Sequence, residues 1–277
     1  MSTDSSQTSN TKRLQGLVAI ITGGASGIGE CCAKVFVKQE AKVVIADIQD
    51  ELGNSLCRQL GSEQTISYIH CDVTCDSDVQ NAVDLAITRY GKLDIMFSNA
   101  GIAGKPELSI LSTENEDFKR VFDVNVYGAF LAAKHAARVM VPAKKGCIIF
   151  TASMVSVNCP QAPHPYVASK HALVGLAKNL CVELGQYGIR VNSISPYVVI
   201  TPQARKTLSM PVNEMEDVIC AAANLKKAVL EGEDVAEAAV YLGSNASKYV
   251  SGINLVVDGG FSLTNPSFAL AMKGLIS

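Results

Sequence analysis

The 277-residue sequence has no surplus of basic charge, no Cys-x-x-Cys pair and no long hydrophobic run. Its 24 Lys and Arg residues are matched by 26 Asp and Glu residues, so a cationic cluster that could neutralise nucleic-acid phosphates is not expected. No stretch approaches the roughly 18–20 apolar residues of a membrane span. We therefore expect neither a nucleic-acid partner nor a membrane anchor.

Metal and disulfide chemistry are equally unsupported. The nine cysteines are an odd number and are scattered through apolar segments, as buried thiols in a reducing compartment are. The four histidines show no metal-ligand spacing, so no metal site is expected.

The two ends of the chain differ in character. Residues 1–13 are polar, lack the apolar core of a secretory signal and carry Asp4, unlike a transit peptide. We predict a disordered leader over residues 1–13, one domain over residues 14–277, and a cytoplasmic protein. The apolar residues 268–272 are predicted to close over a pocket or to pack on a neighbouring subunit.

Strand and helix patterns alternate along the chain. Short apolar runs predict strands at residues 17–21, 42–46, 65–70, 93–97, 147–150, 190–194 and 254–257. Helical patterns lie between them, at residues 29–38, 76–90, 117–140, 166–187 and 234–242. Near-continuous apolar strands are buried on both faces, as in a parallel sheet. The pattern predicts an α/β fold: a single Rossmann-type, doubly wound parallel sheet flanked by helices.

The alternation breaks at about residues 196–232, after a late strand. An insertion at this place is expected to form a small lid over a pocket at the carboxyl ends of the strands. That pocket is expected to be apolar; its candidate lining residues are Ile102, Met154, Val155, Val199, Leu208 and Met210.

A glycine-rich turn follows the first predicted strand and opens a helix. It reads Thr22-Gly-Gly-Ala-Ser-Gly-Ile-Gly29 and contains Gly23, Ser26, Gly27 and Ile28. Glycines let the backbone approach a pyrophosphate, and a helix N-terminus offers free N–H groups. The Gly-x-x-x-Gly-x-Gly spacing is a weak signal alone, but its place between strand and helix favours dinucleotide binding.

Two carboxylates follow at the ends of the next strands. Asp47 ends the second strand and could accept both adenosine-ribose hydroxyls while repelling a 2′-phosphate. Because Ile48 rather than Arg comes next and Ser26 lies in the loop, NAD is predicted over NADP. Asp72 could bind the adenine amine or merely cap the next helix.

The catalytic chemistry is assigned to Tyr166-Val-Ala-Ser-Lys170. A spacing of four residues places both side chains on one face of a helix. A free tyrosine has a pKa of about 10, and nearby cations favour its phenolate. Tyr166 could then take the proton of an alcohol while a hydride leaves its carbon, or return it in the reverse direction.

Two further polar residues are expected near this pair. Ser153, at the end of a strand, can orient the reacting oxygen, although Ser156 is a neighbouring competitor. Asn125 lies within an apolar helical pattern and needs partners; it could hold a water that links Lys170 to solvent.

These motifs together resemble the short-chain dehydrogenase/reductase family over roughly residues 14–261. The resemblance matches the family's glycine motif to Thr22, Gly23, Gly27 and Gly29, and its catalytic tetrad to Asn125, Ser153, Tyr166 and Lys170. It matches Asn99-Ala-Gly101 to an element that stabilises the sheet and flanks the cofactor. It also implies cofactor contacts for the set Ser26, Ile28, Asp47, Asp72, Val73, Asn99, Tyr166, Lys170 and Thr201.

The chain is more narrowly similar to plant NAD-dependent members such as secoisolariciresinol, borneol, isopiperitenol and nepetalactol dehydrogenases. The stretches that carry this similarity are residues 20–29, 97–101 and 195–197. The similarity implies a homotetramer and a small apolar alcohol or carbonyl substrate of terpenoid or phenylpropanoid metabolism.

One departure leaves an alternative open. Val198 stands where these relatives commonly have glycine, and a β-branched residue disfavours a positive φ. A shifted nicotinamide would suit a non-redox, nepetalactol-type cyclase or isomerase that keeps NAD as a structural cofactor. A binding scaffold without catalysis is the other rival, and the intact tetrad argues against it.

Overall fold

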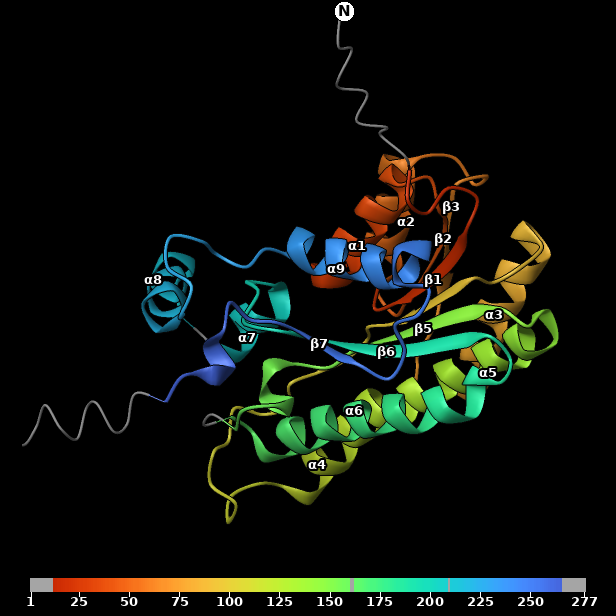
Figure 1. Ribbon diagram of the computed structural model, residues 1–277. Coiled ribbons are helices and arrows are strands. Elements are labelled where there is room, and N and C mark those ends of the chain that lie inside the picture. Colours follow the sequence, from red (N-terminus) through yellow and green to blue (C-terminus); the bar gives the residue numbers. More distant parts are fainter. Residues whose placement is uncertain (1–11, 160–161, 209, 266–277) are drawn as a thin grey trace, which may run out of the picture.

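A computed structural model describes residues 12–159, 162–208 and 210–265 (Figure 1). In this part of the chain one seven-stranded parallel sheet has the order β3-β2-β1-β4-β5-β6-β7. The strand order reverses between β1 and β4, so the sheet is doubly wound. The strands span Val18–Thr22 (β1), Lys42–Asp47 (β2), Ile66–His70 (β3), Ile95–Ser98 (β4), Gly146–Thr151 (β5), Ile189–Pro196 (β6) and Asn254–Val257 (β7).

Helices cover both faces of the sheet. On one face lie α1 (Gly27–Lys38), α2 (Asp50–Leu60) and α9 (Gly232–Gly243), and on the other lie α3 (Asp76–Tyr90), α5 (Gly128–Ala143) and α6 (His164–Gly185) (Figure 1). The inner strands alternate between two apolar clusters: Ile20 packs with α3 and α5, and Ile21 packs with α1 and α9. The predicted fold class is confirmed.

The register brings the carboxyl ends of the central strands to one edge. Thr22 of β1 pairs with Ala46 of β2, and Ser98 of β4 pairs with Phe150 of β5. In a parallel sheet the residues that follow these positions meet at a common crevice. The glycine turn, Asp47 and Ser153 all follow strands at this edge.

The largest departure from prediction lies in the helix expected over residues 117–140. The structure has α4 (Asn115–Phe122), a π-helical turn (Asp123–Tyr127) and α5 in its place. A π turn inserts one residue into the helical repeat, so apolar periodicity alone still reads as one helix. The helix α2 was not predicted because only Gly53 and Leu56 of its residues are buried.

The predicted lid contains two helices, α7 (Pro202–Leu208) and α8 (Val212–Ala222), beyond the carboxyl end of β6 (Figure 1). The start of the domain is anchored: Lys12 Nζ donates to Lys38 O at 2.9 Å, and Arg13 forms an ion pair with Glu237. The rest of the predicted leader and residues 268–272 lie outside the described residues. Within those residues, no helix is long and apolar enough to cross a membrane.

Candidate active site

The glycine turn adopts a shape that only glycine accommodates well. Gly23 and Gly27 have φ values of +61° and +57°. A Cβ on Gly23 would lie 2.8 Å from the Ala100 Cα, and one on Gly29 would lie 2.0 Å from the Gly23 carbonyl oxygen. The turn is therefore packed against the residues that follow β4, with its backbone close to the start of α1.

The N-terminus of α1 is open to an anion. Ser26 stands at the N-cap, but its hydroxyl accepts from Gln49 Nε2 at 3.2 Å and does not cap the helix. The first N–H groups of a helix lack internal partners and carry its positive dipole end. The buried Gly29 and half-buried Ile28 form this first turn, so the geometry fits a dinucleotide pyrophosphate.

Thr22 and Asn99 tie the glycine turn to the neighbouring strands. The Thr22 hydroxyl accepts the N–H groups of Asn99 and Ala100 at 3.0 and 3.1 Å. The Asn99 amide donates to the carbonyl oxygens of Thr22 and Gly23 and accepts from Thr151 Oγ1 at 3.1 Å. Asn99 therefore joins the ends of β1, β4 and β5.

Asp47 is buried at the end of β2 and faces the glycine turn. Its Oδ2 accepts the N–H of Ala25 at 2.9 Å, and its Oδ1 accepts both the backbone and side-chain N–H groups of Gln49 at 3.0 and 3.1 Å. Ile48 is 61% exposed. Gln49, which bridges Asp47 and Ser26, was missed because a single glutamine after a strand carries no sequence signal.

Two further predicted cofactor contacts, Asp72 and Val73, have local roles. The Asp72 Oδ1 accepts the backbone N–H and the hydroxyl of Thr74 at 2.9 and 2.8 Å, which closes a turn before α3. The alternative that Asp72 caps this helix is wrong, because the N-cap is Cys75 and it is not capped by a side chain. The Val73 side chain is buried against α5, where a Cβ on Gly128 would lie 2.7 Å from it. Contacts from Val73 to a cofactor would therefore come from its backbone.

Tyr166 and Lys170 lie on one face of α6, at the carboxyl edge of the sheet. Lys170 is buried; its Nζ donates to the Thr151 carbonyl oxygen at 2.8 Å and lies 5.6 Å from the centre of the Tyr166 ring. Lys170 Nζ would also be 3.4 Å from a Cβ on Gly101. The ammonium thus sits between the end of β5, the segment after β4 and the phenol.

Burial perturbs both groups. It raises the pKa of Tyr166, while the side-chain hydrogen bond with Ser153 lowers it. It lowers the pKa of Lys170 from 10.5 to about 8. Desolvation disfavours the charged form of each group, so a phenolate here depends on neighbouring positive charge.

The structure separates Ser153 from its competitor. Ser156 Oγ is buried, donates to the Ser153 carbonyl oxygen at 2.7 Å and lies 3.0 Å from Ser195 Oγ. Ser153 has an extended backbone and begins a 3-10 turn, and its hydroxyl accepts from the Val155 N–H at 3.4 Å. Ser153 is thus the serine that reaches Tyr166.

Asn125 lies in the π turn and is 1% exposed. Its Oδ1 accepts the Ile102 N–H at 2.8 Å, and its Nδ2 donates to the Ile102 carbonyl oxygen at 2.9 Å and to Ser169 Oγ at 3.0 Å. The π turn aims this amide at the segment after β4. Its water link to Lys170 stays a prediction.

The lid touches the glycine turn through Thr201. A Cβ on Gly27 would lie 3.1 Å from Thr201 Cγ2, and Thr201 Oγ1 accepts the Ala204 N–H at 3.1 Å at the start of α7. Val198 is half-buried and, among the described residues, the only non-glycine positions with a positive φ are Glu40, Lys144 and Lys227. Val198 therefore does not adopt the positive φ that a glycine at this position would allow.

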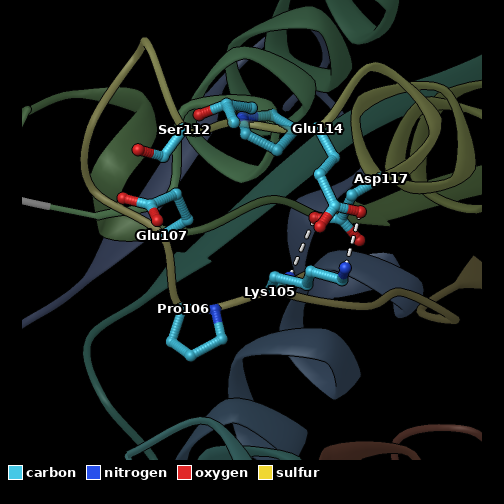
Figure 2. A pocket seen from close by; sticks show the side chains of 8 residues that line it. Lys105, Pro106, Glu107, Ser112, Glu114 and Asp117 are labelled. Atoms are coloured by element: carbon cyan, nitrogen blue, oxygen red, sulfur yellow. Dashed lines mark hydrogen bonds and ion pairs between the residues drawn. The ribbon is translucent and has the colours of Figure 1, made fainter.

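A cavity of about 200 Å³ adjoins the N-terminus of α6 at Pro165 (Figure 2). Its lining is charged: Lys105 Nζ pairs with Glu114 Oε2 at 2.6 Å, and the Lys105 N–H donates to Asp117 Oδ2 at 2.9 Å. This cavity does not match the apolar pocket expected from the sequence. Of that pocket's candidate residues, Met154 and Val155 are buried, and the Leu208 side chain lies outside the described part.

In the described part of the chain, no group of three or more His, Cys, Asp or Glu side chains could hold a metal ion. The polar residues at the sheet edge, around the half-buried Tyr166, the buried Lys170 and an open helix N-terminus, fit a dinucleotide-dependent oxidoreductase type of site.

Comparisons with known proteins agree. A family profile described as enoyl-(acyl carrier protein) reductase matches residues 23–262. Short chain aldehyde dehydrogenase 1 of Euphorbia lathyris is 58% identical, over 97% of this chain and 96% of its own. Secoisolariciresinol dehydrogenase of Forsythia intermedia is 54% identical over 93% of each chain. Borneol dehydrogenase, mitochondrial, of Lavandula x intermedia is 54% identical over 92% and 93%.

Solved structures give the same answer. Levodione reductase superposes with a TM-score of 0.85 at 29% identity, covering 91% of this chain and all of that one. The 3-ketoacyl-(acyl-carrier-protein) reductase from Brucella melitensis, complexed with NADH, gives 0.81 at 32% identity, covering 90% and 99%. The chain belongs to the short-chain dehydrogenase/reductase family.

Proposed function

We propose that this protein is an NAD-dependent oxidoreductase that interconverts a secondary alcohol or lactol and its carbonyl product. The observation that carries the proposal is the buried Lys170 ammonium beside Tyr166, at the sheet edge that also holds the open glycine turn. Burying an ammonium 5.6 Å from the centre of a tyrosine ring costs stability, and a protein that only binds a ligand gains nothing from this arrangement. NAD, when bound, supplies the hydride acceptor or donor.

The chain's own residues handle the proton. Tyr166 accepts the hydroxyl proton of the substrate, and Ser153 hydrogen-bonds and orients the same oxygen. Protonated Lys170 stabilises the Tyr166 phenolate, while its bond to the Thr151 carbonyl oxygen fixes its position. Asn125 holds the backbone of Ile102 beside this pair.

The substrate class is proposed to be a small apolar alcohol or carbonyl compound of plant terpenoid or phenylpropanoid metabolism. Relatives 54% identical carry the names borneol dehydrogenase and secoisolariciresinol dehydrogenase, which designate a terpenoid and a lignan alcohol. The cyclase alternative was motivated by Val198, whose β-branched side chain could shift the nicotinamide. Val198 has no positive φ, so its backbone does not favour the cyclase over the dehydrogenase.

The test is a panel of monoterpenol and lignan alcohols with NAD⁺, followed by both absorbance at 340 nm and product analysis. Steady NADH formation with the matching ketone or lactone as product supports the proposal. Cyclised or isomerised product without net NADH formation would instead establish the cyclase. If no alcohol of the panel is oxidised, cyclised or isomerised, the proposed substrate class is refuted.

Cofactor choice is proposed to depend on Asp47. We expect Asp47→Ala to lower the NAD over NADP preference at least about tenfold, because the repulsion of a 2′-phosphate and the ribose hydrogen bonds are both lost. The measurement is kcat/KM with each cofactor at fixed alcohol. Asp50→Ala, three residues further on in α2, is the matched control. Unchanged discrimination in Asp47→Ala would refute this role of Asp47.

We also propose a homotetramer, assembled in part through the outer face of α4–α6. A mainly apolar groove there is lined by Phe122, Val126, Tyr127, Phe130, Ala172, Gly175 and Leu176, together with Asp123 and Asn179. Tyr127 and Phe130 are 46% and 45% exposed and stack with their ring centres 6.3 Å apart. Exposed apolar patches of this kind mark protein interfaces, and a second copy offers the same exposed aromatic side chains.

Phe130→Glu is therefore expected to dissociate the assembly at micromolar concentration, because a carboxylate would be buried without a partner. Light scattering after size-exclusion chromatography measures the mass. Leu52→Glu, on the exposed surface of α2, is the control and should leave the mass unchanged. A wild type that is monomeric, or a Phe130→Glu protein of wild-type mass, would contradict the proposal.

A cytoplasmic location is proposed on the cysteines. All nine are free thiols, and burial raises the pKa of Cys147 to about 11, which suits an inert thiol in a reducing compartment.

A further inference from the structure

The segment after β4 is held by two amide side chains. From the side of α4–α5, Asn125 accepts the N–H of Ile102 and donates to its carbonyl oxygen, at 2.8 and 2.9 Å. This is the pairing that a neighbouring strand would give, but here a single side chain supplies it. Residues 101–103 depend on such partners because they lie outside any strand.

Gln203 of the lid provides the second pair. With its amide nitrogen toward the Gly101 carbonyl oxygen, at 2.8 Å, its amide oxygen accepts the Ala103 N–H at 3.1 Å. This orientation is the one in which each atom faces a complementary partner. Gln203 and Asn125 thus bind opposite sides of the same two peptide groups, 101–102 and 102–103.

The segment they hold borders the reacting groups. A Cβ on Gly101 would lie 3.2 Å from Asn125 Oδ1 and 3.4 Å from Lys170 Nζ. Asn125 and Lys170 therefore fill the space beside Gly101 that a side chain would otherwise take. Meanwhile Thr201, two residues before Gln203, packs over Gly27 of the glycine turn.

We propose that Gln203 is a positioning residue that fastens the start of the lid to the segment 101–103. The fastening holds Thr201 over the glycine turn and Gly101 against Asn125 and Lys170. Lid opening then requires breaking the two hydrogen bonds of Gln203 to Gly101 and Ala103. Loss of these two bonds is therefore expected to lower the affinity for the dinucleotide. This coupling rests on the proposed NAD-dependent function, whereas the fastening itself is a property of the protein alone.

The hydrogen bonds are tested first without cofactor. In Gln203→Leu, which has similar size and no amide, we expect the Ala103 amide to exchange with deuterium at least about tenfold faster. Gln203→Glu keeps the shape of the side chain but turns a carboxylate oxygen toward the Gly101 carbonyl oxygen. Because these two oxygens repel each other, the Ala103 amide should exchange as fast in Gln203→Glu as in Gln203→Leu. Thr207→Ala, which removes a hydroxyl that donates to the Gln203 carbonyl oxygen within α7 and leaves the Gln203 amide intact, is the matched control and should exchange like the wild type.

The coupling is tested by calorimetric titration of NAD into the same four proteins. Gln203→Leu and Gln203→Glu should each bind NAD about tenfold more weakly than the wild type and Thr207→Ala. Unchanged Ala103 exchange in Gln203→Leu would overturn the fastening, and faster exchange with unchanged NAD affinity would overturn the coupling. A wild-type protein that does not bind NAD would refute the proposed function. The fastening by Gln203 would then be tested by the hydrogen-exchange result alone.

Discussion

Tyr166→Phe is expected to lower kcat for alcohol oxidation by about 10²–10⁴-fold, the usual contribution of a positioned general acid or base. The phenol oxygen is the group that takes the substrate proton, and phenylalanine has no replacement for it. The ring remains, so the packing of α6 around the Lys170 ammonium should be kept. NAD affinity, which depends on the glycine turn and Asp47, should stay within about fivefold of the wild type, since the change removes no charge and one neutral hydrogen bond contributes only about 1 kcal/mol.

Two measurements separate the possible outcomes. Turnover is followed at 340 nm with the best substrate of the alcohol panel, and NAD binding is measured by calorimetry on the same protein. Tyr187→Phe, just beyond the far end of α6, makes the same chemical change away from the sheet edge and should be fully active. Full activity of Tyr166→Phe would eliminate the mechanism, and a joint loss of activity and NAD binding would assign Tyr166 to binding alone.

The sequence predicted the sheet well because its strands are short, apolar and bounded by turns. All seven predicted strands exist, and the helix over residues 76–90 has the predicted bounds. Parallel strands buried on both faces leave little choice of pattern, so local composition and tertiary structure agree. The same logic placed the glycine turn, Asp47 and Ser153 at one edge.

What the sequence could not reveal depends on hydrogen bonds between distant segments. The π turn at Asn125 is stabilised by its amide bonds to Ile102 and Ser169, and neither partner shows in a helical periodicity. Gln203 acts through the backbone of residues 101–103, which are far from it in sequence. Val198 illustrates a related limit, because its residue type alone could not show whether the backbone at this position has a positive φ, and the structure shows that it does not.

Lys170 presents a conflict between activity and stability. Burial lowers its pKa from 10.5 to about 8, so the folded protein disfavours the charge that the Tyr166 phenolate needs. A change of this size corresponds to about 3 kcal/mol against folding, present in full below pH 8 where the folded site is protonated. As pH rises from about 8 to 10.5 the penalty falls, because the folded site loses its proton before the unfolded chain does.

Lys170→Met should therefore be inactive yet more stable. Methionine matches the length of the lysine stem without the charge, and loss of the hydrogen bond to the Thr151 carbonyl oxygen offsets about 1–2 kcal/mol of the gain. We expect kcat to fall by about 10²–10⁴-fold. At pH 7 the free energy of unfolding should rise by about 1–2 kcal/mol, and this gain should shrink or reverse at pH 9.5.

Urea unfolding at the two pH values measures the difference, with Lys178→Met on the exposed surface of the same helix as the control. The control should show neither the loss of activity nor a pH-dependent gain in stability. A Lys170→Met protein that is less stable than the wild type at pH 7 would mean that the buried ammonium stabilises the fold. The hydrogen bond of the ammonium to the Thr151 carbonyl oxygen and its contact with the Tyr166 ring would then outweigh the cost of its desolvation.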